Sequence, residues 1–147
     1  MNNQIEIKVL DKEGIEILLE KMGSILSKYD EITLAYAFGS FLRGEFRDID
    51  IAVLLGKEFA PYRAMKFAMK VGREIEKELG YSFEIDVKVL NHSPFHFQNE
   101  VINTGRVVFC RDEKKRLKFE EIVLSKYLDY RNTGEWFKRI QLRAKHG

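Results

Sequence analysis

Residues 37–55, which read AFGSFLRGEFRDIDIAVLL, decide the fold of this chain. The apolar residues at the start predict a strand that ends at Phe38. Gly39 and Ser40 then predict a sharp turn, followed by a short polar loop or helical turn. Glycine lets the backbone approach another group closely, and a serine where a helix begins offers a hydroxyl and an N–H to a phosphate. The turn is therefore a candidate phosphate-binding site.

A second strand opens with Asp48-Ile49-Asp50. Side chains alternate across a strand, so the two aspartates are predicted to share one face while Ile49 points to the other. Carboxylates crowded on one face repel each other, and a bound hard divalent cation usually offsets this repulsion. The pattern predicts a metal next to a phosphate.

These residues resemble the nucleotidyltransferase superfamily, whose signature is Gly-Ser followed by Asp-x-Asp at the start of the next strand. The small size resembles the minimal (MNT) branch, the nucleotidyltransferase partners of HEPN proteins. The third carboxylate of the family lies on a later strand, and the matching residue here is Asp86 in the alternating run FEIDVKVL. Seven residues separate Ser40 from Asp48, which is shorter than the familiar pattern.

The carboxylates also define the expected chemistry. Asp48, Asp50 and Asp86 are expected to hold one or two Mg²⁺ ions, whose shells are completed by water and substrate phosphates. Such a site neutralises charge during displacement at the α-phosphorus of a nucleoside triphosphate. We expect Asp86 to be the base, Gly39 and Ser40 to hold the pyrophosphate end, and Arg43 to be either a further phosphate ligand or a surface charge. The resemblance implies ATP as the substrate.

Composition is that of a folded protein of 147 residues with 45% hydrophobic content. We expect a single domain, with a core at about residues 31–110 and a C-terminal helical segment at 111–147. A single cysteine, Cys110, excludes an intramolecular disulfide and fits a reducing cytoplasm. No signal peptide or membrane span is visible, and a net charge of +2 gives no argument for direct nucleic-acid binding. The expected location is cytoplasmic.

Hydrophobic spacing predicts an α/β fold, with a short mixed sheet and helices mainly on one side. Helices are expected at Lys12–Lys28 with Asp11 as its N-cap, from Pro61 to a stop at Gly80, at Phe95–Asn103 and at Arg111–Tyr130; strands are expected at Ile32–Phe38, Asp48–Leu55, Tyr81–Leu90 and, as a brief buried strand, Val107–Cys110. Met65, Ala68, Gly72, Ile75 and Leu79 are expected to form the buried stripe of the second helix.

The last helix carries more apolar residues than one buried stripe needs. About half are expected to pack on the sheet, and the rest to form an exposed patch suited to a protein partner. All the apolar and aromatic residues considered, packed and exposed together, are Leu117, Phe119, Ile122, Leu124, Tyr127, Leu128, Tyr130, Trp136 and Phe137.

The chain has no room for a second domain that would hold the acceptor, so another protein is expected to supply it. That agrees with what the MNT resemblance implies: an antitoxin in a hetero-oligomer, which transfers AMP from ATP to a tyrosine of a HEPN ribonuclease toxin. Two alternatives stay open. One is a non-catalytic antitoxin that acts by binding, its short 41–47 loop having lost turnover. The other is a nucleotidyltransferase for a small hydroxylated molecule such as an aminoglycoside.

Overall fold

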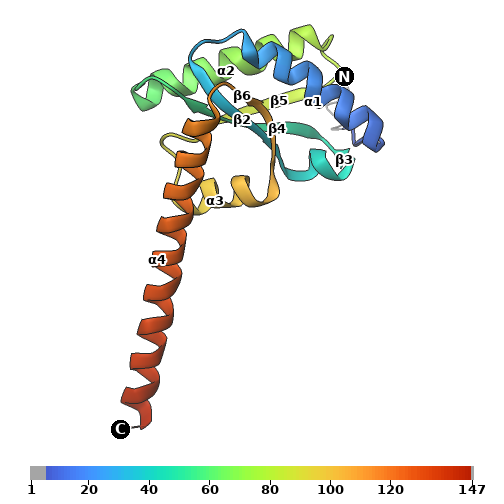
Figure 1. The fold of residues 1–147 in the computed structure, drawn as a ribbon. Coiled ribbons are helices and arrows are strands. Elements are labelled where there is room, and N and C mark those ends of the chain that lie inside the picture. The colour runs from blue at the N-terminus through green and yellow to red at the C-terminus, as the bar shows by residue number, and fades with distance from the viewer. Residues whose placement is uncertain (1–5, 147) are drawn as a thin grey trace.

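The computed structural model describes residues 6–146 and shows a mixed four-stranded sheet between two layers of helices (Figure 1). The helices are α1 (Lys12–Ser27), α2 (Pro61–Glu78), α3 (Phe95–Thr104), α4 (Glu113–His146) and the 3-10 helix η1 (Gly39–Arg43); the strands are β1 (Lys8–Val9), β2 (Ile32–Phe38), β3 (Glu45–Phe46), β4 (Asp48–Leu55), β5 (Glu84–Val89) and β6 (Arg106–Cys110). The predicted fold class is confirmed.

The main sheet has the strand order β5-β4-β2-β6. β4 pairs with β5 in parallel through the α2 crossover, whereas β2 pairs antiparallel with both β4 and β6. β1 and β3 form a separate two-stranded ribbon beside the turn that precedes β4. The predicted mixed sheet is therefore present, and β5 is one of its edges.

The helices cover both faces of the sheet, so the expectation that they lie mainly on one side is wrong. α1 and α2 pack on the face that carries Ile49, Ile51 and Ile85. α3 and the first turns of α4 pack on the opposite face, where Tyr36 and Leu90 are buried. Figure 1 shows α1 and α2 above the sheet and α3 and α4 below it.

Local sequence signals explain the start of α1 and both ends of α2. The Asp11 side chain accepts a hydrogen bond of 2.8 Å from the Gly14 N–H, as an N-cap should. α2 begins at Pro61, and the chain leaves it through Gly80 at φ 70°. Both predicted boundaries of α2 are thus confirmed.

Three other expectations are wrong. Met65 is 52% exposed rather than buried, because Ala64 and Val71 occupy the inner face of α2. β6 is an exposed edge strand rather than a buried one, with Val107 43% exposed. The last helix does not end at Tyr130 but continues to His146, far beyond the body of the protein (Figure 1).

α4 is anchored at its N-terminal half. The buried Tyr36 hydroxyl donates a hydrogen bond of 2.7 Å to the Glu120 carboxylate, and Arg116 pairs with the same carboxylate at 3.2 Å. Further along, the Tyr130 ring packs against His96 of α3, with centroids 4.6 Å apart. The side chains of Trp136 and Phe137 lie outside the described residues. No helix in the described part of the chain is both long and apolar enough to cross a membrane.

Candidate active site

The strand register brings the predicted carboxylates together. Asp50 of β4 lies opposite Asp86 of β5, and Asp48 lies opposite Glu84. Because side chains alternate along both strands, all four carboxylates lie on the same face of the sheet. This is the face covered by α3 and α4, but Glu84 and Asp86 are exposed at its edge. The predicted shared face of Asp48 and Asp50 is confirmed, and the register brings Asp86 to the same face.

Asp50 is the most perturbed of these groups. Its carboxyl is partly buried, and this burial, together with the negative charges of Asp48 and Asp86, raises its pKa to about 6 from an ordinary value of 3.8. The positive charge of Lys88 acts in the opposite direction. Neighbouring carboxylates make the ionisation of this carboxyl group less favourable, and such crowding is typical of a cation-binding site.

Lys88 is a further charge of this site, and it pairs with Asp86. Its ammonium lies 4.0 Å from the Asp86 carboxylate and 5.7 Å from the centre of the Phe97 ring in α3. The signal was present in the alternation of β5, which places Lys88 on the face of Asp86. Lys88 partly neutralises the carboxylates in the metal-free protein.

Gly39, in the turn that precedes β4, lies against the Asp50 carboxylate. Its φ is 80°, which is a left-handed conformation that side chains disfavour. A Cβ atom at this position would lie 2.9 Å from Oδ2 of Asp50. The absence of a side chain at Gly39 therefore sets how the Asp50 carboxylate sits against the turn.

The short segment 41–47 is well packed rather than slack. The Phe41 ring is fully buried and meets the Phe46 ring edge to face, with centroids 5.0 Å apart. Gly44 turns the chain at φ 89°, and its carbonyl accepts a hydrogen bond of 2.9 Å from the Leu10 N–H. Ser40 is partly buried at the start of η1, and Arg43 is exposed near its end. η1 itself contacts β4, so the turn is held against the carboxylates.

The donor set suits magnesium, although it does not enclose an ion by itself. Within residues 6–146, no three His, Cys, Asp or Glu side chains are grouped closely enough to hold a metal ion as they stand. Mg²⁺ does not require such a cage, because it keeps several waters and is usually bound by one or two carboxylates together with substrate phosphates. The neighbouring aspartates of β4, with Gly39 against one of them, fit that mode of binding.

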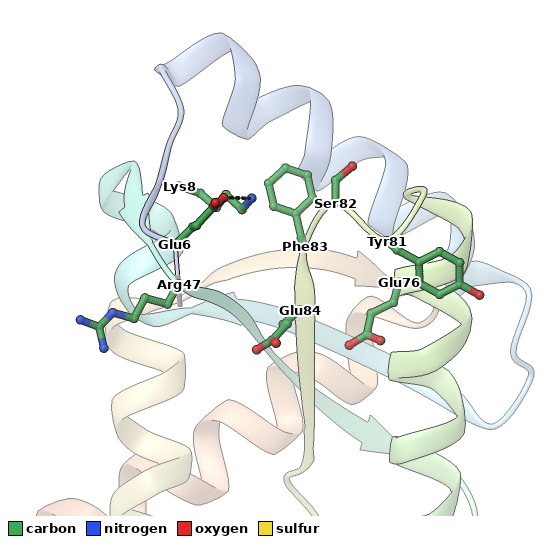
Figure 2. Close-up of a pocket in the computed structure, with 8 residues that line it drawn as sticks. All are labelled: Glu6, Lys8, Arg47, Glu76, Tyr81, Ser82, Phe83 and Glu84. Carbon is green, nitrogen blue, oxygen red and sulfur yellow. Dashed lines mark ion pairs between the residues drawn. The ribbon is translucent and has the colours of Figure 1, made fainter. Parts of the chain in front are cut away.

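A cavity of about 270 Å³ lies beside the carboxylates at the start of β5. Its lining includes Arg47, which directly precedes Asp48, and Glu84, the register partner of Asp48. Figure 2 shows the Glu84 and Glu76 carboxylates on either side of β5, with Arg47 turned away from both. The sequence pattern did not predict this cavity, because residues from β1, α2 and β5 form it together.

Comparison with known proteins agrees with this geometry. The family described as Polymerase beta, Nucleotidyltransferase matches residues 20–114, which include the Gly-Ser turn and all three aspartates. Among curated proteins, none matches the chain.

Solved structures share the fold at low sequence identity. A complex of a tri-AMPylated HEPN toxin with an MNT antitoxin, from Shewanella oneidensis, matches with a TM-score of 0.62 and 18% identity, over 81% of this chain and 91% of that one. The toxin–antitoxin complex MntA–HepT matches with a TM-score of 0.61 and 18% identity, over 80% and 91% of the two chains. A toxin–antitoxin complex with AMP-PNP matches with a TM-score of 0.57 and 20% identity, over 84% and 92%.

Proposed function

The chain belongs to the polymerase beta nucleotidyltransferase family, and on that premise we propose that it transfers AMP from ATP to a hydroxyl of a partner protein. The observation that carries this proposal is the register of Asp50 against Asp86, with Gly39 placed against the Asp50 carboxylate. Together they place the Gly39-Ser40 turn next to three carboxylates on one face of the sheet, of which Asp86 lies on the edge strand β5.

In this proposal Asp48 and Asp50 hold Mg²⁺, with Asp86 as the third carboxylate. When bound, the ion stabilises the charge that develops on the phosphates. Gly39 and Ser40 hold the leaving pyrophosphate through their backbone N–H groups and the Ser40 hydroxyl. Asp86 accepts the proton of the acceptor hydroxyl. The hydroxyl oxygen then bonds to the α-phosphorus, while the bond from that phosphorus to the pyrophosphate oxygen breaks. Arg43 is a further phosphate ligand.

We infer that the acceptor is a tyrosine of a HEPN toxin, so that the chain acts as an antitoxin. The three structural neighbours named above are all described as toxin–antitoxin complexes, one of them with a tri-AMPylated HEPN toxin.

Intact-mass spectrometry tests the proposal directly. A HEPN protein is incubated with this chain, ATP and Mg²⁺, using the wild type and Asp86→Asn. We expect the HEPN protein to gain one or more AMP units only with the wild type. A toxin that is silenced in a tight complex without a mass change would instead establish the binding-only antitoxin, and modification of an aminoglycoside without a protein partner would establish the third alternative.

The exposed stripe of α4 is expected to hold the partner. Leu117, Leu124 and Leu128 follow a helical spacing of seven and four residues, and all three are exposed. Leu124→Glu is expected to weaken the complex with the HEPN protein at least about tenfold, because it places a charge in an apolar contact. Isothermal titration calorimetry measures this, with the exposed Ser125→Glu on the same helix as the control. Equal affinity for both variants would contradict an α4 interface.

A further inference from the structure

The two helices on the face opposite the proposed active site carry opposite charges on their outer surfaces. Figure 1 shows α1 and α2 together on this side of the sheet. The acidic stripe of α1 is defined as Glu13, Glu16 and Glu20, and the basic stripe of α2 as Arg63, Lys66, Lys70, Arg73 and Lys77, all of them exposed. Members of each stripe recur at intervals of three or four residues, so each stripe forms one line along its helix.

The charges of the basic stripe find no acidic partner within the described residues. None of the five forms an ion pair among residues 6–146, and Lys66 instead lies 4.9 Å from the centre of the Tyr62 ring. Within the same range, Glu16 is the one paired member of the acidic stripe, and its partner is Arg106 of β6. At about 100° per residue, the remaining charged residues of the two helices lie on the flanks of the stripes, and they are Lys12, Lys21, Glu74, Glu76 and Glu78.

Exposed apolar side chains accompany both stripes. Ile17 is 47% exposed on α1, and Met65 and Met69 are 52% and 54% exposed on α2. Methionine is enriched where proteins meet, because its flexible side chain adapts to the partner surface. Since exposed ion pairs contribute little stability by themselves, the apolar side chains would supply the contact and the charges would set its orientation.

The opposite signs of the two stripes decide which partner fits. A nucleic acid or an anionic membrane would be attracted by α2 but repelled by the acidic stripe of α1 on the same face. A second copy of this chain, turned by a two-fold axis, offers a basic stripe to the acidic one and an acidic stripe to the basic one. Such a surface is self-complementary, which is what a two-fold symmetric interface requires.

We propose that this face binds a second copy of the chain about a two-fold axis, with α1 of each copy against α2 of the other. The helices have 16 and 18 residues and are thus about 24 and 27 Å long and about 10 Å wide, so the face offers roughly 500 Å² per copy. Because this area is near the lower limit for a specific interface, we expect a salt-sensitive dimer with a micromolar Kd.

The dimer goes beyond the proposed function and does not depend on it. Asp48, Asp50 and Asp86 lie on the other face of the sheet, together with α3 and α4. Both active sites and both α4 helices therefore stay accessible in the dimer.

Sedimentation equilibrium of the full chain at micromolar concentrations measures the Kd of the dimer. We expect the dimer to weaken when salt rises from about 0.05 to 0.5 M, because the stripes are exposed and their attraction is screened. Lys66→Glu together with Lys70→Glu is expected to raise the Kd at least about tenfold, because it places like charges opposite each other. The matched control is Lys114→Glu with Lys118→Glu, two exposed lysines of α4 at the same spacing, which should leave the Kd unchanged.

A charge swap tests the pairing of the stripes themselves. Glu13→Lys together with Glu20→Lys should weaken the dimer as much as the reversal on α2 does. The variant that combines all four substitutions should dimerise again with a Kd near that of the wild type, because opposite charges face each other once more. This variant keeps the wild-type net charge of +2, so recovery would not come from overall charge, and it would also show that the reversals do not unfold the protein.

Four results would overturn the proposal. One is a wild type that stays monomeric in low salt, and another is a quadruple variant that stays as weak as the double variants. A dimer that resists both reversals but is lost in Leu124→Glu would place the contact on α4. Binding of a labelled oligoribonucleotide through Lys66 and Lys70, without self-association, would make the basic stripe a nucleic-acid site.

Discussion

Replacing Asp50 with asparagine is expected to abolish AMP transfer and at the same time to stabilise the metal-free protein. Transfer should fall at least about a thousandfold, because loss of a metal ligand removes several kcal/mol of transition-state stabilisation. Stability should rise because the wild-type carboxylate is partly buried beside Asp48 and Asp86, which disfavours its charge. The same substitution thus lowers the rate of AMP transfer and raises the stability of the folded protein, a combination that is typical of catalytic residues.

The pH dependence follows from the direction of the pKa shift. The pKa of Asp50 is about 6 in the folded protein and 3.8 ordinarily, so the folded state holds its proton more tightly than the unfolded state. The resulting stabilisation is complete below about pH 4 and is lost as the pH rises through 6. Because the side chain is partly exposed, we expect a loss of about 1–2 kcal/mol rather than the full amount that the shift implies.

Differential scanning calorimetry in EDTA checks this expectation. The Tm of Asp50→Asn should exceed that of the wild type by roughly 2–6 °C at pH 7.5, and the difference should shrink towards zero at pH 4. Asp129→Asn, at an exposed aspartate of α4, serves as the control and should shift the Tm little at either pH. A wild type that gains stability between pH 4 and 6 relative to Asp50→Asn would contradict the assignment of Asp50 as the strained carboxylate.

The sequence predicted the elements whose signals are local. Alternation placed Asp48 and Asp50 on one face of their strand, and the helix between the second and third strands predicted a parallel or mixed sheet; both are confirmed, because β4 runs parallel to β5 and antiparallel to β2. These predictions succeeded because a period of two residues fixes which side chains of one strand share a face, and because a strand–helix–strand crossover favours parallel strands. Alternation within one strand does not fix the face of the next, so only the register brings Asp86 to the face of Asp50.

The sequence did not predict features that depend on how the layers meet. Met65 and Ala64 are adjacent on α2, and only the approach of the helix to the sheet decides which of them is buried. The Tyr36–Glu120 hydrogen bond, which fixes α4 on the second face, joins residues 84 positions apart.

Gly39→Ala is expected to cost more in activity than in stability. An alanine at φ 80° costs about 1–2 kcal/mol of folding free energy, because its Cβ atom strains the left-handed conformation. The new atom would also lie 2.9 Å from Oδ2 of Asp50, which must move to relieve the clash. That oxygen belongs to a proposed metal ligand, and a displacement of about 1 Å in such a site lowers turnover by about a hundredfold.

A matched glycine separates the two effects. Gly80 has a similar φ of 70°, but a Cβ atom there would have no heavy atom within 4 Å. Gly80→Ala should therefore lose as much stability as Gly39→Ala and retain wild-type turnover, measured as AMP incorporation into the HEPN protein at saturating ATP. The affinity for Mn²⁺ should fall only for Gly39→Ala, because only there does the added methyl group displace a carboxylate. Equal turnover in the two variants would show that Gly39 is needed for the turn alone, and that its contact with Asp50 has no part in the reaction.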